Sequence, residues 1–502
     1  MGTLPVAVAM FLLAVQTPIM AAPAKKLDLS ISQCRKLALE RNLDIKIAEL
    51  APALSRQNVI GASGIFDPAL SAATSYNWSQ PPGVAQIEDV DAQGNLIIRE
   101  VTYPKSEYYA ASVGVDKKFA FGTELGFDVS TVLNDRSTSS VYTSTARISV
   151  SQPILKGFGK TATEGTLIIA RKDLANSESK FRDDVATTIS ETEQDYWSLV
   201  QAKQSLRVAE LSMKASKRLL DEVQAGAATG THTISDIIEA QADLASKQQI
   251  ILARQAVVRD REDVLRTRLH LTLDPGSWES AIVPSDTPAV GSVLPPVDTL
   301  LAVARRDRRD LRRARMVIKI DKISVQMKKN SALPSLDVTG SLALKDSDDD
   351  LGTSADDIPT AKYRDWRLGL DFRVPIGNRS ASSSYRTALI RLKSNELTLR
   401  KLELQVQSDV RSAYRQVEST RKQIAAAALT RRLRERQLDV AMERLRLGLV
   451  TSYNVIQAQE YLATARDSYL SAQIGHQKAF VDLELATGTL LSSRNIKLVA
   501  TE

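Results

Sequence analysis

Two stretches without proline, from about Thr163 to Ala228 and from about Ser380 to Leu447, constrain the fold more than any other feature. Glycine occurs only near their ends, and the chain is rich in Ala, Leu, Arg and Gln, which favour helix. At about 1.5 Å per residue, each stretch would form a helix of roughly 100 Å. A helix of that length does not fit inside one globular core, so we expect it to lie along neighbouring helices.

After each stretch, a glycine turn precedes a second helix whose apolar residues recur every seven positions. The two series are Ile237, Leu244, Ile251, Val258 and Leu265, and Val455, Leu462, Tyr469, His476 and Leu483. In the second helix Ala458, Ala465, Ala472 and Ala479 complete a 3-4 spacing, which is typical of a coiled-coil seam with close helix approach. The sequence therefore predicts two long helical hairpins.

The chain contains an internal repeat. Gly230, Ile237 and Gln241 lie 218 positions before Gly448, Val455 and Gln459, and Pro68 lies 266 positions before Pro334. The segment 148–154 matches 370–376, and each contains the proline that ends an alternating run. Between the proline markers the first half spans 85 residues and the second spans 41, so the first half holds 44 more. That surplus is about the size of a β-hairpin with its loop.

Between the helical parts, apolar residues alternate with small or charged ones. The apolar series are Tyr109, Ala111, Val113 and Val115; Ala146, Ile148 and Val150; Leu336, Val338, Leu342 and Leu344; and Trp366, Leu368, Leu370, Phe372 and Val374. The opposite positions include Ser112, Asp116, Arg147, Ser149, Arg367, Asp371 and Arg373. This period of two predicts about six strands, four in the first half and two in the second, with one apolar and one wet face.

The pattern leaves few ways to cross a membrane. Beyond the leader no stretch has the roughly 18 to 20 apolar residues of a spanning helix, so a membrane span would have to be a β-barrel. A closed barrel needs at least about 8 strands. If the alternating segments span a membrane, several chains must share one barrel.

The apolar stretch at 5–15 and the small residues ending in Ala22-Pro23-Ala24 predict a secretory signal peptide cut near Ala24, with a buried N-terminal helix as the alternative. The predicted organisation is a signal peptide (1–24), first-half N-terminal helices (25–65), first-half barrel strands with an extra hairpin (66–155), a helical hairpin (156–275), a linker (276–296), a second-half N-terminal helix (297–332), second-half barrel strands (333–377), a second helical hairpin (378–490) and a C-terminal tail (491–502).

Four motifs in this order resemble the duplicated TolC-like outer membrane efflux proteins: Leu27-Asp28-Leu29-Ser30-Ile31, Ser151-Gln152-Pro153-Ile154-Leu155-Lys156-Gly157, Val374-Pro375-Ile376-Gly377 and Leu445-Arg446-Leu447-Gly448. The resemblance covers essentially all of the mature chain. It implies a mixed fold, mainly α, in which a homotrimer forms a 12-stranded transmembrane barrel, four strands from each subunit, and a periplasmic α-helical barrel. The extra first-half hairpin departs from this pattern, and it either lengthens the barrel wall, lies outside the membrane or adds strands.

The resemblance also implies a function. The chain would be the exit duct of a tripartite efflux or type I secretion system in the outer membrane of a Gram-negative bacterium, extending into the periplasm. It would contact outer-membrane lipid, a periplasmic adaptor (membrane fusion) protein and an inner-membrane pump. No cofactor or metal is implied.

The same resemblance places the helical turns at the periplasmic entrance. Adaptor contacts would involve Gly230, Thr231, His232, Gly448, Leu449 and Val450. Asp236 and Glu239, one helical turn apart, would form acidic rings in a trimer that narrow the entrance and favour cations. The repeat-equivalent Asn454 and Gln457 are neutral. The alternative is that Asp236 only caps its helix, where the helix dipole stabilises a carboxylate.

Other functions find little support. No nucleotide loop, metal signature or nucleophile motif occurs, and three histidines leave little for acid–base chemistry. A coiled-coil adaptor or scaffold would explain the helices without the paired strands, and an envelope hydrolase is the remaining rival. The net charge of +7 and the arginine run at 305–315 could suggest nucleic acid, but the interleaved Asp307 and Asp310 favour a solvated or inter-subunit helix face.

Three isolated features are interpreted structurally. Cys34, the single cysteine, is expected to be a half-buried helix residue. His476 is expected to be a packed seam residue, because no second ligand lies at metal-binding spacing. The acidic run Asp346, Asp348, Asp349, Asp350, Asp356 and Asp357 approaches a calcium loop, but Leu351 takes the place of the required glycine. A solvated extracellular loop is therefore expected.

Overall fold

The computed structural model describes residues 26–80, 84–90, 94, 96–101, 106–136, 139–271, 278, 280–288, 294–356, 358–360 and 363–498. The chain forms two compact units. The helical unit comprises the described residues within 26–46, 185–301 and 409–496, and the sheet unit comprises those within 47–184, 302–408 and 497–498. The predicted leader, Asp357, and parts of the predicted linker and tail lie outside the described residues.

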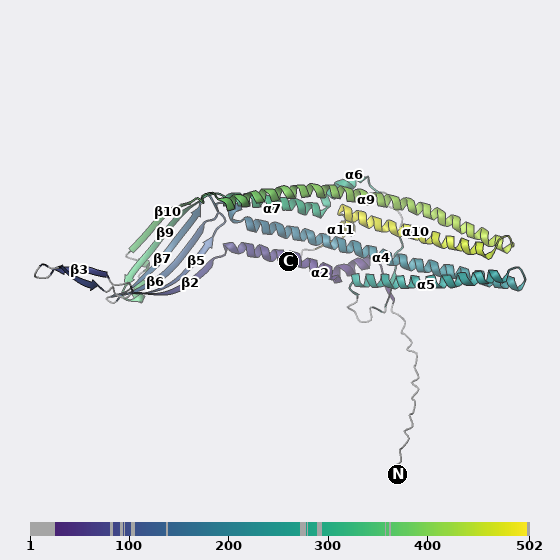
Figure 1. The fold of residues 1–502 in the computed structure, drawn as a ribbon, viewed down its shortest axis with the longest axis horizontal. Coiled ribbons are helices and arrows are strands. Elements are labelled where there is room, and N and C mark those ends of the chain that lie inside the picture. Colours follow the sequence, from purple (N-terminus) through teal and green to yellow (C-terminus); the bar gives the residue numbers. More distant parts are fainter. Residues whose placement is uncertain are drawn as a thin grey trace, which may run out of the picture. The chain divides into compact units, whose positions relative to one another are not determined.

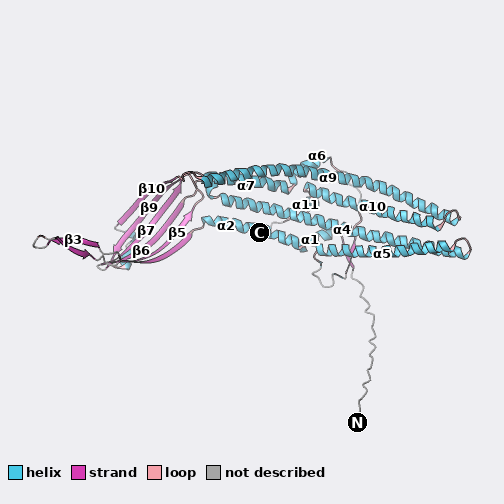
Figure 2. Ribbon diagram, viewed as in Figure 1, coloured by secondary structure: helices cyan, strands magenta, loops and turns pink. Residues whose placement is uncertain are grey.

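The two long helical hairpins are present (Figure 2). The helix α4 (Gly165–Ala228) has 64 residues and α9 (Arg379–Arg446) has 68, as expected from the proline-free stretches. Each is followed by a shorter helix, α5 (Ile234–Arg268) or α10 (Ser452–Thr487). The turns contain Gly230 at φ 79° and Gly448 at φ 68°, in the left-handed region where glycine has no Cβ to clash.

The N-terminal helices repeat as well. In the first half α1 (Ile31–Arg41) is followed by α2 (Leu43–Ser63), and in the second α6 (Val297–Asp307) is followed by α7 (Arg309–Ser331). The break falls at Asn42 and at its repeat-equivalent Arg308, with φ −63° at both and ψ 124° or 122°. The single second-half helix predicted over 297–332 is therefore two helices, because Arg308 adopts this extended conformation.

The arginine run, expected on one helix face, is divided between α6 and α7 by the break at Arg308, and several of its members pair with nearby acids. Arg308 forms an ion pair with Asp310 at 2.6 Å, and the guanidinium group of Arg309 lies 3.7 Å from a carboxylate oxygen of Asp183 on α4. Arg313 pairs with the same carboxylate. The local acids thus neutralise part of the basic run.

The core of the helical unit follows the predicted seam. Leu219 and Val223 of α4 pack with Leu445 of α9 and Val455 of α10. Seam residues of α10 that are buried are Val455, Ala458, Leu462, Ala465, His476, Ala479 and Leu483. In α5, Val258 and Leu265 are buried, whereas the seam residues nearer the turn are only partly buried. This unit also contains the parallel pair β1 (Lys26–Leu29) and β8 (Ala281–Pro284) and the short α11 (Leu490–Ser493).

The sheet unit contains an antiparallel sheet in the order β10-β9-β7-β6-β5-β2 (Figure 1). Its strands are β2 (Ala69–Ser79), β5 (Ser106–Lys118), β6 (Glu124–Arg136), β7 (Ser139–Pro153), β9 (Ser335–Asp348) and β10 (Tyr363–Arg373). Four come from the first half and two from the second, as the alternation predicts. Short helices η1 (Gly64–Phe66) and α3 (Lys160–Thr163) flank the first-half strands.

The register separates the two faces of this sheet. One row of partners crosses all six strands through Leu70, Val115, Phe127, Ile148, Leu342 and Trp366. These side chains are exposed, from 39% for Val115 to 79% for Trp366. The adjacent row, on the other side, runs through Ser71, Gly114, Asp128, Arg147, Ala343 and Asp365. We call the first side the apolar face and the second the polar face.

The extra first-half segment adds strands to the sheet. β2 and β9 follow the equivalent Pro68 and Pro334, and β7 and β10 lead to the equivalent Pro153 and Pro375. Whereas β9 pairs directly with β10, the strands β5 and β6 lie between β2 and β7. A second hairpin, β3 (Val84–Val90) with β4 (Leu96–Val101), forms a separate two-stranded sheet.

The interpretation of the acidic run as a solvated loop is wrong for Asp346. This residue lies inside β9, and its side chain is only 1% exposed. The short helix α8 (Leu351–Asp356) contacts β7 and β9, and its buried Ser354 accepts a hydrogen bond from the backbone N–H of Ser144 at 3.2 Å. Asp349 and Asp350 are exposed, as expected. The 3₁₀ helix η4 (Ile358–Thr360) follows α8.

Candidate functional site

The two helical turns share one local structure. In the first, the backbone N–H of Asp236 donates to Thr233 Oγ1 at 3.3 Å while the carboxylate of Asp236 accepts from the backbone N–H of Thr233 at 2.9 Å. In the second, Asn454 Oδ1 accepts from the N–H of Thr451 at 3.3 Å. Both are capping boxes, which satisfy free donors at the start of a helix. Asp236 therefore takes part in capping α5.

Asp236 has a further contact that reaches the other turn. Its Oδ1 accepts a hydrogen bond from Ser452 Oγ at 2.9 Å, and Glu239 Oε2 lies 3.4 Å from the same hydroxyl. Ser452 is the first residue of α10 and is fully buried. The structure thus brings the two predicted entrance acids together around one serine. We call Asp236, Glu239 and Ser452 the turn cluster.

The electrostatics of the turn cluster favour a charged Asp236. Hydrogen bonds from the backbone and the side chain of Thr233 lower the pKa of Asp236, and the bond from Ser452 adds to them. The carboxylate is therefore ionised at neutral pH. A neutral Asn454 fills the equivalent position in the second turn, so the acidic group belongs to one turn only.

Sequence reasoning missed two residues of the site. Ser452 is the repeat-equivalent of Ile234, which is 77% exposed, and this hydroxyl in place of an apolar side chain was the available signal. Gly226, in the last turn of α4, is the other. A Cβ there would lie 2.2 Å from Cδ2 of His232, so the imidazole packs where only glycine leaves room. His232 is accordingly part of the first turn's packing rather than a free surface group.

The remaining predicted turn residues differ in exposure. Thr231 is exposed, and its N–H donates to the carbonyl of Gly226 at 2.9 Å. Leu449 is 70% exposed, whereas Val450 packs against the cluster of Leu219, Val223, Leu445 and Val455. Other large apolar side chains exposed at the turns are Ile234, Ile238, Leu447 and Tyr453. Exposed apolar groups concentrated in this way are typical of a protein-binding surface.

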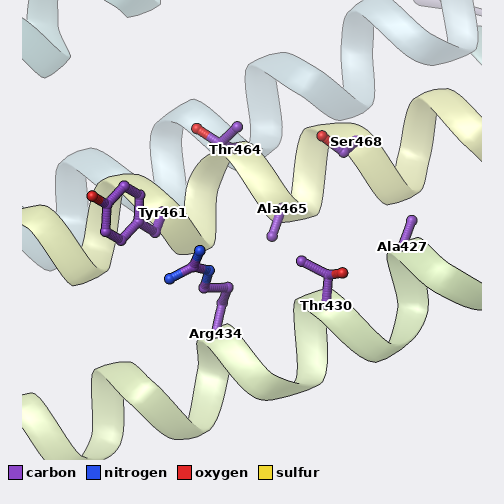
Figure 3. Close-up of a pocket in the computed structure, with 7 residues that line it drawn as sticks. All are labelled: Ala427, Thr430, Arg434, Tyr461, Thr464, Ala465 and Ser468. Carbon is purple, nitrogen blue, oxygen red and sulfur yellow. The ribbon is translucent and has the colours of Figure 1, made fainter.

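A groove lies between α9 and α10 farther from the turns (Figure 3). It has a volume of about 320 Å³ and is lined by Ala427, Thr430, Arg434, Tyr461, Thr464, Ala465 and Ser468. The guanidinium group of Arg434 stacks over the Tyr461 ring at 4.5 Å from its centroid. The groove exists because the side chains of Ala427 and Ala465 are small. Its lining contains both polar and apolar groups.

The polar face of the sheet forms a second candidate surface. A hollow of about 350 Å³ there is lined by residues that include Asp116, Glu124, Asp128, Arg147 and Arg367. Gly126 has no side chain, which leaves room for Asp116 and Ser149 because a Cβ would lie 2.7 Å from an oxygen of each. Both signs of charge are therefore presented on one hydrated surface. Such a surface suits the wall of an aqueous channel.

Cys34 and His476, the remaining reactive side chains considered above, are buried in the helix packing. Cys34 is fully buried, more than expected, and burial raises its pKa to about 12. His476 is 1% exposed and lies 3.0 Å from Thr420 Oγ1, which confirms the packed seam position. Among the described residues, no group of three His, Cys, Asp or Glu side chains is placed to hold a metal ion. No helix in the described ranges combines the length and apolarity that a membrane crossing requires.

Comparison with known proteins gives consistent matches. The family "Outer membrane efflux protein" matches residues 118–269 and 300–489. The outer membrane efflux protein BepC of Brucella suis biovar 1 (strain 1330) is 23% identical over 363 residues, which cover 70% of this chain and 74% of BepC.

Solved structures show the same fold. CusC, described for conformational changes in folding and transmembrane channel formation, has a TM-score of 0.67 and 16% identity, covering 95% of this chain and 98% of CusC. The CmeC outer membrane channel of Campylobacter jejuni has a TM-score of 0.64 and 16% identity, covering 91% of this chain and 85% of CmeC.

Proposed function

The chain belongs to the outer membrane efflux protein family, and on that premise we propose that it is the exit duct of an efflux or type I secretion system. In this proposal three copies form a channel in the outer membrane of a Gram-negative bacterium, and the helical hairpins extend into the periplasm. An adaptor protein and an inner-membrane pump would deliver the substrate, and the channel would conduct it passively. We propose no enzymatic activity and no cofactor.

One observation carries this proposal, namely the two-faced sheet. A row of exposed Leu, Val, Phe, Ile and Trp side chains crosses all six strands, and small, polar and charged residues occupy the other side. A soluble protein would bury such an apolar face, whereas the outside of a transmembrane barrel presents it to lipid. The scaffold alternative gives no reason for this sheet.

The turn cluster supports a gate at the periplasmic entrance. Ser452 joins its own turn to Asp236 and Glu239 of the other turn, so the cluster holds two turns of one subunit together. With three subunits, the ionised Asp236 side chains would form an acidic ring. Such a ring favours cations, while the hydrogen bonds of Ser452 hold the two turns of each subunit together.

The exposed apolar side chains at the turns support an adaptor contact. Leu447, Leu449 and Tyr453 are 65%, 70% and 56% exposed in the second turn. We propose that an adaptor covers these side chains together with the exposed parts of 230–232 and 448–450. Leu449→Glu should then weaken adaptor binding in a pull-down of detergent-solubilised protein. Leu433→Glu on α9, where the leucine is 55% exposed, is the matched control.

The main test is reconstitution in a planar lipid bilayer. Purified protein should require detergent and should produce discrete conductance steps. A gene deletion should increase accumulation of an efflux dye, and the wild-type gene should reverse that increase. A water-soluble monomer that gives no conductance would refute the proposal and favour the scaffold. The hydrolase rival would be favoured if at least one His, Ser or Glu substitution abolished function while leaving membrane assembly intact.

A further inference from the structure

The six-stranded sheet has two free edges. In the part of the chain that the structure describes, β2 pairs only with β5, and β10 pairs only with β9 (Figure 1). Both edge strands have 11 residues, and all residues of β2 and all but Gly369 of β10 are exposed. An unpaired edge presents free N–H and C=O groups, which a lipid environment cannot satisfy.

The surface pattern continues to both edges without change. Leu70 on β2 and Trp366 on β10 end the same apolar row and are 74% and 79% exposed. On β2 the even positions Leu70, Ala72, Thr74 and Tyr76 lie on the apolar face, as do Trp366, Leu368, Leu370 and Phe372 on β10. At these positions, neither edge strand has a proline or a charged residue on its apolar face, either of which would oppose pairing with another strand. The pattern is that of a wall that continues beyond the chain.

The strand directions also allow continuation. An antiparallel sheet with an even number of strands ends on two strands that run in opposite directions, here β2 and β10. The β2 edge of one copy can therefore pair in antiparallel fashion with the β10 edge of the next. One copy cannot close by itself, because six strands are fewer than the roughly 8 that the smallest transmembrane barrels use.

We propose that three copies of this chain close into one barrel of 18 strands through three β2–β10 seams. This inference rests on the proposed trimeric channel, and it specifies how the subunits join and how wide the lumen is. The insertion of β5 and β6 raises the contribution of each copy from four strands to six. Because barrel diameter grows roughly in proportion to strand number, the lumen is about 1.5 times as wide as in a 12-stranded barrel.

The inserted strands also supply charge to the lumen. Asp116 of β5 and Asp128 of β6 lie on the polar face beside Arg147 of β7. In the repeat, where no such hairpin is inserted, the charges of that face come from Asp337 and Lys345 of β9 and from Asp365, Arg367, Asp371 and Arg373 of β10. A barrel of this width with interleaved signs would select weakly among small ions, as expected of an aqueous pore.

Disulfide cross-linking between copies tests the seam. In a Cys34→Ala background, Leu368→Cys on β10 is combined with a cysteine at each even β2 position from Leu70 to Tyr76. The matched controls place the second cysteine at Ser71, Ala73 or Ser75, which lie on the polar face. Oxidation should link copies for at least one even position and for no odd position, because a slip of one residue would turn the side chain to the other face.

The size of the linked species tests the strand count. Denaturing gels should show covalent species of up to three copies and no more. Linked species that stop at two copies would indicate a 12-stranded barrel of two chains and would overturn the inference. Absence of linkage at every even position, in a protein that conducts in bilayers and migrates as a trimer, would also overturn it while leaving the proposed function intact. If the protein neither conducts nor assembles, the proposed function itself fails.

Discussion

Removing the charge of Asp236 should loosen the link between the two helical turns without unfolding α5. The variant Asp236→Asn keeps one amide oxygen for the capping box, and the repeat shows that asparagine suffices there, because Asn454 accepts from Thr451 N–H and Oγ1 at 3.3 and 3.2 Å. What changes is the bond to Ser452 Oγ at 2.9 Å. Its charged acceptor becomes a neutral amide.

The size of the effect follows from this one bond. A hydrogen bond to a charged group contributes about 1.5–3 kcal/mol and a neutral one about 0.5–1.5 kcal/mol. The asparagine NH₂ group can still donate to Ser452 Oγ, and the serine hydroxyl can turn to Glu239 Oε2, 3.4 Å away. The expected loss is therefore about 1 kcal/mol, which is roughly a fivefold change in the opening equilibrium. Ser452→Ala removes the link completely and should have the larger effect.

A double-mutant cycle separates the link from other effects. Open-channel current in a bilayer and hydrogen exchange of peptides covering the two turns should both increase roughly fivefold in Asp236→Asn. Adding Asp236→Asn to Ser452→Ala should then change little. Asn454→Asp is the control, because that position has no equivalent of the Ser452 bond. Unchanged current and exchange in both single variants, or fully additive effects in the double variant, would refute the role of this bond.

Three further predictions concern the helical unit. The pKa of Asp236 is lowered in the folded protein, so the stabilisation that its carboxylate gives to the closed turns is complete above the unfolded pKa of about 3.9 and is lost as pH falls through the lower folded pKa. Bilayer current should therefore be constant from about pH 8 to 5. A rise in current centred above about pH 5 would contradict this. Gly226→Ala should destabilise the first turn by about 1–3 kcal/mol in thermal melts, because its Cβ would lie 2.2 Å from Cδ2 of His232 and 2.8 Å from Oγ1 of Thr231. In a background that combines His232→Ala with Thr231→Ala, the same change should become neutral or stabilising, through the better helix propensity of alanine. A loss of stability in both backgrounds would argue against the packing explanation. Glu193 is 1% exposed and pairs with two arginines, one of them Arg494 at 2.9 Å. Glu193→Ala should lower the free energy of unfolding by about 3 kcal/mol, because it leaves partly buried arginines without their partner. An unchanged melting temperature in detergent would show that these ion pairs are dispensable.

Much of the fold could be predicted because its signals are local and repeated. The proline-free stretches specify α4 and α9, and the period of two specifies which side chains of β7 or β10 share a face. The break at Arg308 has no local signal in the sequence, since no proline or glycine marks it. Its only signal was the repeat, which places it opposite Asn42.

The position of the extra hairpin and the burial of Asp346 could not be predicted, for different reasons. Alternation tells which face a residue lies on, but not which strand pairs with which, so three placements of the hairpin fitted the same pattern. Asp346 sits in an acidic run that looks solvated, and only the tertiary contact of α8 with β7 and β9 covers it. In the turn cluster, Asp236 and Glu239 could be named only because the first turn resembles the entrance hairpin of the family. That resemblance did not point to Ser452, whose partner Asp236 lies 216 positions away.

The placement of β5 and β6 between β2 and β7 implies a rule for how such walls can change during evolution. Adding one strand would reverse the direction of β7, and the chain would leave the sheet at the end opposite to α3 and α4. Adding a complete hairpin keeps every later direction intact. The width of such a barrel can therefore change only by two strands per chain at a time. A duplicated gene offers two independent places at which to insert such a pair of strands.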